Sequence, residues 1–236
     1  EHPAAFAAYI DRGDSIVISA SPEQFFRIDS SESGRVITAS PIKGTRPRGT
    51  SNEEDARLRQ ELLNSEKDRA ENTMIVDLMR NDLGRVCEFG SVTVAELCRI
   101  DEHPTLFHLV STVRGSLRSG IGHADVIRAL FPCGSITGAP KISTMGIIDE
   151  LEGAARGLSM GAIGCRIPAG WLAPGEIFEA SVAIRTMTIC DGRATFNVGG
   201  GVVIDSDAAG EYEESLLKAK ALLTALGVDD QTFSGK

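Results

Sequence analysis

The stretch from Lys67 to Val86 reads KDRAENTMIVDLMRNDLGRV, and it carries the strongest helix signal in the chain. Its apolar residues recur at helical spacing, which predicts one apolar helix face. These residues are Ala70, Met74, Ile75, Leu78 and Met79. Gly84 follows them and predicts the C-terminal end of the helix. We therefore predict a helix over residues 67–83.

Strand signals lie on both sides of this helix. Upstream, apolar and β-branched runs predict strands over residues 15–19, 24–28 and 35–39, followed by a charged helix over 53–63. Downstream, strands are predicted over 91–97, 163–167, 181–189, 195–198 and 202–204, whereas 107–113 fits a strand or a helix. Further helices are predicted over 125–131, from Pro140 as first residue, and over 208–226. Strands and helices without strict alternation predict an α+β fold.

Composition and charge narrow the class of protein. The chain has 236 residues, of which 42% are hydrophobic, as in an ordinary soluble domain. Its net charge of -9 and lack of a long Lys/Arg run argue against nucleic-acid binding. No apolar run approaches the roughly 18 residues of a membrane span. Five cysteines without a Cys-x-x-Cys pair favour reduced thiols in a cytoplasmic protein.

Two of the predicted helices carry carboxylates beside an apolar face. Asp68 and Glu71 are three residues apart, and Glu71 falls beside the apolar face of its helix. In the last helix Glu211, Glu214 and Lys218 follow at i, i+3 and i+7. Carboxylates at the edge of a core are costly unless they are paired, and Mg²⁺ would pair them. A solvated helix face with intrahelical ion pairs is the commoner explanation of such spacing, so both remain open.

Two glycine-rich segments could bring backbone close to a ligand. The segment Gly134–Lys141, GSITGAPK, is a turn that leads into a helix, where backbone N–H groups can hold an anion. It lacks the Gly-Lys-Ser/Thr ending of a phosphate-binding loop, and a tight connector is equally favoured. Gly199 to Gly201 interrupt a predicted strand and do not match the dinucleotide fingerprint. They could let a ligand approach the backbone, but a β-bulge is favoured.

Arg185 lies inside the predicted strand 181–189 and shares a face with Ala183 and Met187 if side chains alternate. An inward-facing Arg needs a carboxylate partner from the protein or from a ligand. An ordinary outward-facing strand residue is equally favoured.

Lys43 and His108 are ambiguous when each is taken alone. Lys43 lies between Pro41 and Gly44, which predicts a turn, and a lysine in a turn is usually solvated. It becomes a nucleophile only as the free amine. A single histidine such as His108 is more often structural than catalytic.

Together these segments resemble the chorismate-utilising enzymes, which include anthranilate synthase component I, aminodeoxychorismate synthase component I and the isochorismate and salicylate synthases. The resemblance runs from about Pro3 to Leu226. The matching segments are SPE (21–23), PIKGTRPR (41–48), residues 67–86, HLVSTVRG (108–115), GSITGAPK (134–141), VAIRT (182–186), GGGVVID (199–205) and residues 211–218. Within the family, PIKGT resembles aminodeoxychorismate synthases, whereas anthranilate synthases have PIAGT.

The resemblance implies a fold and a set of residue roles. The fold is a chorismate-binding domain over residues 1–236, built from large antiparallel sheets packed with helices and lacking the family's N-terminal region. The implied catalytic residues are Lys43 as nucleophile, Glu23 as general acid/base, and His108 near the ring. The implied substrate-binding residues are Thr45, Arg185, Gly201 and Lys218, and the implied Mg²⁺ ligands are Glu71 and Glu214, with Glu211 and Asp68 close by.

The implied reaction is the Mg²⁺-dependent amination of chorismate to 4-amino-4-deoxychorismate, for p-aminobenzoate and folate synthesis. Ammonia is expected from a separate glutamine amidotransferase subunit, with no nucleic-acid or membrane partner. Two alternatives remain. One is anthranilate synthase component I, which also eliminates pyruvate. The other is an inactive chorismate-binding or assembly fragment, because the sequence begins at Glu1 without an initiator Met.

Overall fold

A computed structural model describes residues 4–204 and 206–228, and its internal contacts divide the chain into two compact units. Of the described residues, the first unit takes 23–153 and 162–182. The second unit takes 4–22, 154–161, 183–204 and 206–228. The single domain over residues 1–236 stays a prediction.

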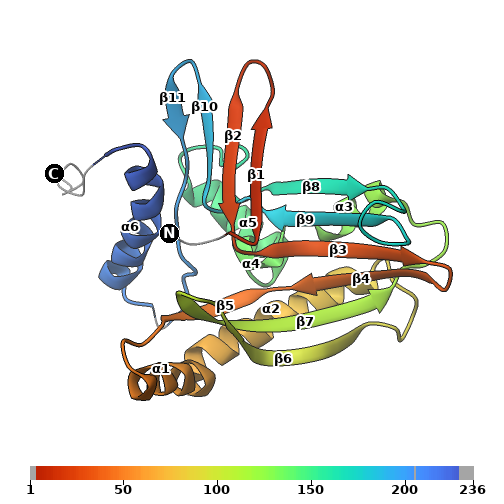
Figure 1. The fold of residues 1–236 in the computed structure, drawn as a ribbon, viewed down its shortest axis with the longest axis horizontal. Helices are drawn as coiled ribbons and strands as arrows, with labels where there is room; N and C mark the ends of the chain where they lie inside the picture. The colour runs from red at the N-terminus through yellow and green to blue at the C-terminus, as the bar shows by residue number, and fades with distance from the viewer. Residues whose placement is uncertain (1–3, 205, 229–236) are drawn as a thin grey trace. The chain divides into compact units, whose positions relative to one another are not determined.

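The first unit is built on a seven-stranded antiparallel sheet of order β5-β7-β4-β3-β9-β8, in which β6 also pairs with β7 (Figure 1). The strands are β3 (Gln24–Ser31), β4 (Gly34–Ser40), β5 (Ile42–Pro47), β6 (Thr93–Glu102), β7 (Leu106–Ser116), β8 (Ala162–Ile167) and β9 (Ile177–Val182). Both β4 and β5 pair with β7, at Ala39↔Val113 and Ile42↔Val110. Strand β7 therefore aligns β4 and β5, which follow each other in the chain.

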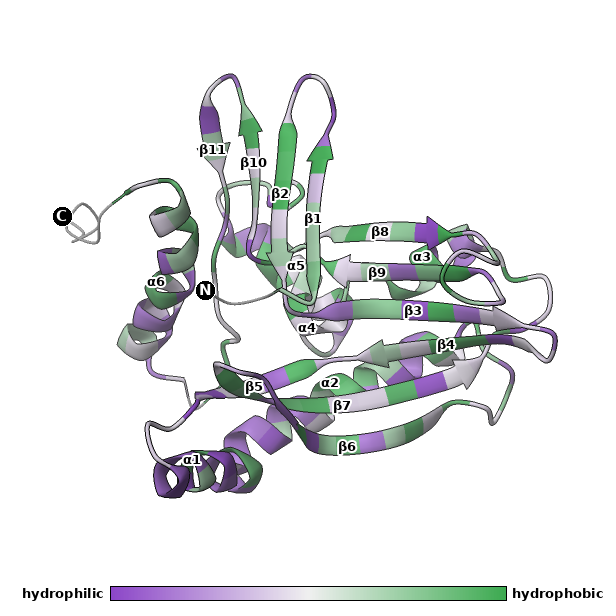
Figure 2. Cartoon of the chain, viewed as in Figure 1, coloured by the Kyte–Doolittle hydropathy of each residue, from purple (hydrophilic) through white to green (hydrophobic). Residues whose placement is uncertain are grey.

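Five helices accompany this sheet: α1 (Asn52–Asn64), α2 (Glu66–Gly84), α3 (His123–Leu130), α4 (Gly134–Thr137) and α5 (Lys141–Leu151). The predicted helix over 67–83 is confirmed as α2, which ends at Gly84 and buries Ile75, Met79 and Leu83. Its start is fixed by Ser65, whose hydroxyl accepts a hydrogen bond from the Asp68 N–H at 3.2 Å. Helix α1 is mostly hydrophilic in Figure 2, and Leu62 is its one buried residue.

The second unit contains a four-stranded antiparallel sheet of order β1-β2-β10-β11 and one long helix. The strands are β1 (Phe6–Asp11), β2 (Ile16–Ser21), β10 (Thr186–Cys190) and β11 (Arg193–Thr195). The helix is α6 (Ala208–Ala225), which Asp207 caps by accepting from the Gly210 N–H at 2.8 Å. Helix α6 buries Ala219 and Leu222, much less than α2 does.

The α+β class is confirmed, but the predicted strand over 181–189 is wrong. Strand β9 ends at Val182 and β10 begins at Thr186, and they belong to different sheets. Arg185 lies between them with φ of 50°, a left-handed conformation that does not continue a strand. Apolar residues on both sides of the break hide it, since Ala183 and Met187 are each buried.

Other differences follow from local backbone geometry. Lys43 lies in strand β5 and not in a turn, because Gly44 takes a φ of 83° without ending the strand. Residues 107–113 are strand, and β1 and β5 were not predicted. Strand β11 ends at Thr195, and residues 202–204 form no strand. Pro140 caps α5, which begins one residue later than predicted.

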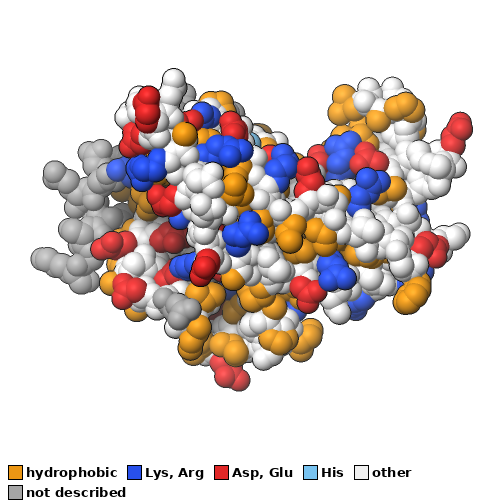
Figure 3. Space-filling model, turned by 90° about the horizontal axis from the view of Figure 1, so that it is seen from below, with side chains coloured by type: hydrophobic (Ala, Val, Ile, Leu, Met, Phe, Trp, Pro, Cys, Tyr) orange, Lys and Arg blue, Asp and Glu red, His pale blue; other side chains and the backbone are white. Residues whose placement is uncertain are grey.

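Charges of both signs are interspersed over the face seen in Figure 3. None of the helices within the described residues is both long and apolar enough to span a bilayer.

Candidate functional site

Three segments of the first unit bring Glu23 and Lys43 to the same serine. Glu23, just before β3, is 6% exposed. The Nζ of Lys43 on β5 donates to the Ser135 carbonyl oxygen at 3.2 Å. The carboxylate of Glu23 is hydrogen-bonded by the Ser135 side chain and by the backbone of Ile42. A buried acid and a half-buried lysine are thus joined through one residue of α4.

Burial raises the pKa of the Glu23 carboxyl above its ordinary value. The Ser135 hydrogen bond, the positive charge of Lys43 and the Ile42 hydrogen bond act in the opposite direction but are smaller effects. A carboxyl with a raised pKa keeps its proton to higher pH than an exposed one, which suits a general acid.

Thr45 and His108 face each other across β5 and β7, at paired positions of the sheet. The Thr45 Oγ1 and the His108 Nδ1 are 2.9 Å apart, and His108 is 5% exposed. The ring of His103 packs edge-on against His108, with 5.4 Å between the ring centres. The sheet therefore fixes the orientation of the His108 ring close to the end of β5 that carries Lys43.

Gly44 allows β5 to approach α2 closely. A Cβ atom on Gly44 would lie 2.9 Å from the Cβ and Cγ of Asp68 and from a methyl group of Leu62. Any side chain at position 44 would push β5 away from α2. The glycine thus brings the strand that carries Lys43 against the helix turn that carries Asp68.

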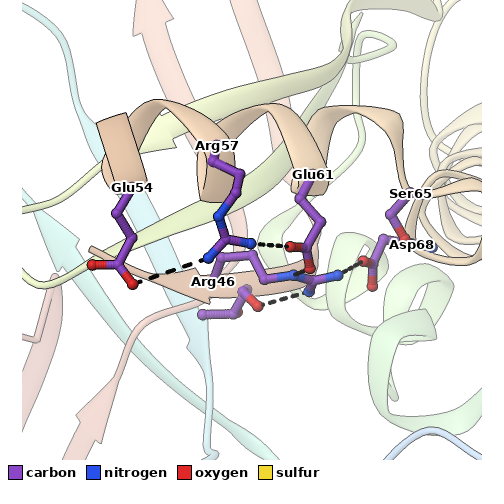
Figure 4. Close-up of polar contacts among 7 residues, drawn as sticks. Arg46, Glu54, Arg57, Glu61, Ser65 and Asp68 are labelled. Carbon is purple, nitrogen blue, oxygen red and sulfur yellow. Dashed lines mark hydrogen bonds and ion pairs between the residues drawn. The ribbon is translucent and has the colours of Figure 1, made fainter. Parts of the chain in front are cut away.

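Asp68 and Glu71 are mostly buried and face cations. The Asp68 carboxylate accepts from Arg46 at 3.2 Å, and Arg46 also pairs with Glu61 at 2.9 Å (Figure 4). Glu71 lies 4.0 Å from the Lys67 amine. The side chains of Asp68 and Glu71 are 16% and 17% exposed, so these ion pairs do not belong to a fully solvated helix face.

In the second unit, α6 and the glycine segment 199–201 approach each other. The Lys218 Nζ lies 2.6 Å from a Glu214 carboxylate oxygen and donates to the Gly199 carbonyl at 3.1 Å. A Cβ on Gly200 would lie 2.8 Å from Glu211 Oε2 and 4.0 Å from Glu214 Oε1. The predicted β-bulge is wrong, because no strand includes these glycines. They form a loop, Gly201 included, beside two carboxylates and a lysine.

Arg185 is half-buried, and burial lowers the pKa of its guanidinium. Among the residues that the structure describes it forms no ion pair. Its backbone carbonyl accepts from the Ala20 N–H at 3.0 Å, which ties the residue to the end of β2. A partly desolvated Arg of this kind favours an anionic ligand.

The predicted Mg²⁺ ligands form two pairs, Asp68 and Glu71 in the first unit and Glu211 and Glu214 in the second. Within residues 4–204 and 206–228, no group of three or more His, Cys, Asp or Glu could hold a metal by itself. Carboxylate oxygens are nevertheless the ligands that Mg²⁺ prefers, often only one or two from the protein. The oxygens of Glu211 and Glu214 approach the same glycine, which fits such a pair.

The segment GSITGAPK packs as a connector. A Cβ on Gly134 would lie 2.7 Å from Leu78 and 2.9 Å from Met79, so the segment lies directly on α2. Sequence reasoning did not single out Ser135, whose partner Lys43 is 92 residues away along the chain. No local pattern reveals a contact over that separation.

Comparison with known proteins places these residues in a family. A family model described as chorismate binding enzyme matches residues 1–224. The aminodeoxychorismate synthase of Streptomyces griseus is 48% identical over 99% of this chain and 31% of its own length. Aminodeoxychorismate synthase component 1 of Bacillus subtilis is 44% identical over 98% of this chain and 47% of its own. The chain therefore spans less than half the length of both relatives.

A solved structure agrees with this fold. Anthranilate synthase component I from Streptococcus pneumoniae superposes with a TM-score of 0.78 at 37% identity, over 94% of this chain and 46% of that one. The family model, the relatives and the fold all agree, and the chain belongs to the chorismate-binding enzymes.

Proposed function

We propose that the protein containing this chain aminates chorismate to 4-amino-4-deoxychorismate. The proposal rests on one observation: Lys43 and the buried Glu23 are both hydrogen-bonded to Ser135. The relatives from S. griseus and B. subtilis are both aminodeoxychorismate synthases by name, in agreement with the PIKGT segment at residues 41–45.

In the proposed reaction Glu23 protonates the 4-hydroxyl of chorismate, which is otherwise a poor leaving group. The free amine of Lys43 adds to C2 of the ring, the two conjugated ring double bonds shift, and the hydroxyl leaves C4 as water. Ammonia then attacks C4, both double bonds shift back, and Lys43 departs from C2 as an amine. The spare proton of the new ammonium group restores the acid form of Glu23, and the enolpyruvyl group is retained.

The remaining predicted residues are proposed to bind substrate. Arg185 would pair with the carboxylate of the enolpyruvyl side chain, since it is half-buried and has no other ion pair among the described residues. Thr45 and His108 would line the ring pocket, supported by their mutual hydrogen bond. The backbone of Gly201 and the amine of Lys218 would hold the ring carboxylate.

Mg²⁺ is proposed as the cofactor, with Glu71 and Glu214 as ligands and Asp68 and Glu211 close by. When bound, it would neutralise charge on the dianionic substrate. The observation in favour is that Glu211 and Glu214 both approach Gly200 in the second unit.

The ammonia source is proposed to be a glutamine amidotransferase subunit, since the B. subtilis relative is called component 1 of its enzyme. The product would feed p-aminobenzoate and folate synthesis in the cytoplasm.

Product analysis tests the proposal. The native protein that contains this chain is incubated with chorismate, Mg²⁺ and ammonium, and the products are separated and identified. We expect 4-amino-4-deoxychorismate without pyruvate. Anthranilate with an equal amount of pyruvate would contradict the proposal and establish the anthranilate synthase activity that the S. pneumoniae structure represents. Chorismate binding without turnover would support the inactive-fragment alternative.

A further inference from the structure

A buried ion pair joins α2 to the start of α5, away from the residues proposed to touch substrate. The Lys141 Nζ lies 2.6 Å from Asp82 Oδ2, and the two side chains are 11% and 4% exposed. The same Nζ donates to the Leu130 carbonyl oxygen at 2.8 Å. Lys141 therefore connects the end of α3, the last turns of α2 and the first residue of α5.

These bonds close the segment that carries Ser135. Leu130 and Lys141 lie at its two ends, and Gly134 in its middle packs against Leu78 and Met79 of α2. Ser135 comes next, with its side chain on Glu23 and its carbonyl on Lys43. Any shift of the segment along α2 would move Ser135 away from both groups.

Stability alone does not explain this ion pair. Burial raises the pKa of the Asp82 carboxyl, and the hydrogen bond and charge of Lys141 only oppose that effect. Removing two charges from water costs much of what their attraction returns, so apolar residues of similar size can be equally stable at such places. What apolar residues would not supply is a fixed distance and direction between α2 and the segment.

We propose that Asp82 and Lys141 are positioning residues for catalysis: their ion pair locks the segment 131–140 onto α2 and thereby holds Ser135 against Glu23 and Lys43. The proposal rests on the proposed function only through the roles of those two groups. Without the pair, Ser135 loses its fixed place and Glu23 loses a hydrogen bond that stabilises its charged form. The positive charge of Lys43 acts to lower the pKa of Glu23, and that of Lys141 acts to lower the pKa of the nearby Cys133.

The test replaces both partners together, because removal of one leaves a buried charge unpaired. The double variant Asp82→Asn/Lys141→Met keeps the volumes and is expected to fold. We expect kcat for chorismate turnover to fall about 30-fold to 100-fold, as for a displacement of about 1 Å, with KM changed less than threefold. The alkaline limb of the pH profile should move upward, because loss of the Ser135 hydrogen bond raises the pKa of Glu23. A folded double variant with unchanged kcat and pH profile would overturn the proposal.

Two further variants separate positioning from general stability. Adding Asp82→Asn/Lys141→Met to Ser135→Ala should shift the alkaline limb little beyond the shift of Ser135→Ala alone, since both act through one hydrogen bond. Fully additive shifts would contradict the proposal. Lys141→Arg keeps the charge and should retain most of kcat. If the double variant does not fold, Asp82→Asn alone replaces it with the same expected loss of kcat, since Lys141 then still bonds to the Leu130 carbonyl. The exposed pair Arg59–Glu102 supplies the control, Arg59→Met/Glu102→Gln, with unchanged kinetics.

One readout does not depend on turnover. The infrared band of the protonated Glu23 carboxyl, identified by its loss in Glu23→Gln, reports its pKa directly. An upward shift in the double variant would support the positioning role even if chorismate is converted to a different product or to none. An unshifted band would refute that role in either case.

Discussion

The two units hold their candidate residues by different means. In the first unit, Lys43, Thr45 and His108 lie on paired strands, and Glu23 is buried beside β3. In the second unit, Glu214 and Lys218 project from a helix with two buried residues, and a glycine loop faces them. Groups that must meet reacting atoms at a fixed distance profit from a rigid scaffold, whereas charges that bind an anion or a cation tolerate more freedom. Under the proposed function, the covalent chemistry would fall to the first unit, and the second unit would contribute to charge binding.

The largest effect is expected for Lys43→Ala. If Lys43 is the nucleophile, amination should fall by roughly 10⁴-fold or more while chorismate still binds. Turnover and binding are measured on the same preparation, with the exposed Lys220→Ala as the control lysine. Unchanged turnover would exclude an obligatory covalent role and remove the chemistry from the first unit.

A smaller loss is expected for Glu23→Gln, which keeps the shape but cannot donate a proton. Removal of a general acid should lower kcat roughly 10²-fold to 10³-fold. In the unsubstituted protein burial raises the pKa of Glu23, so the acid form persists to higher pH than for an exposed carboxyl, and activity falls as pH rises through that pKa. The pH–rate profile should lose this alkaline limb in the variant. If the alkaline limb persists in the variant, it reports the titration of a group other than Glu23.

In the first unit, local sequence patterns predicted the features that are set by residues close together in the sequence. The spacing of Ile75 and Met79 predicts the buried face of α2, and Gly84 predicts its end. Lys43 was misplaced because Pro41 and Gly44 are turn signals, although the positive φ of Gly44 serves a close approach to Asp68. That approach joins two elements far apart in sequence, so no local pattern contains it.

The arrangement of the candidate residues was less predictable than their identities. Glu23 and Lys43 could be named from motifs, but Ser135 between them could not, nor could the ion pair from Asp82 to Lys141 over 59 residues. The prediction of one strand over 181–189 was wrong for a similar reason, because the change of sheet depends on long-range contacts. The buried Ala183 and Met187 continue the apolar pattern across a change of sheet. Only long-range packing distinguishes one continuous strand from two strands that belong to different sheets.

Gly44→Ala should disturb the packing of β5 against α2 and so test the rigid scaffold of the first unit. Its Cβ would meet Asp68 and Leu62 at 2.9 Å, and a φ of 83° is strained for alanine. We expect a loss of about 2–4 kcal/mol in the free energy of unfolding, measured by denaturant titration. Gly34→Ala has a φ of 124° with nothing within 4 Å, so it shows the cost of backbone strain alone. Equal losses in the two variants would refute the close packing of β5 on α2.

Gly200→Ala should have the smallest effect on stability, because its Cβ would meet only the ends of the flexible Glu211 and Glu214 side chains, at 2.8 Å and 4.0 Å. We expect a change below about 0.5 kcal/mol in unfolding free energy. Mg²⁺-dependent chorismate binding, measured by calorimetry, should weaken roughly 10-fold as Glu211 is displaced. Gly199→Ala, with only Met160 at 3.5 Å, is the matched control. Equal binding by both variants would argue against a charge-binding role for the loop.

The covalent role of Lys43 is tested most directly by its chemical state during one turnover. The native protein is mixed with a small excess of chorismate and Mg²⁺ but no ammonia, quenched at intervals, digested and analysed by mass spectrometry. If Lys43 is the nucleophile, the peptide that contains it gains the mass of chorismate less one water, and added ammonia removes that mass. Consumption of chorismate with this peptide unmodified at every interval, or with the added mass on another residue, would contradict the covalent role of Lys43.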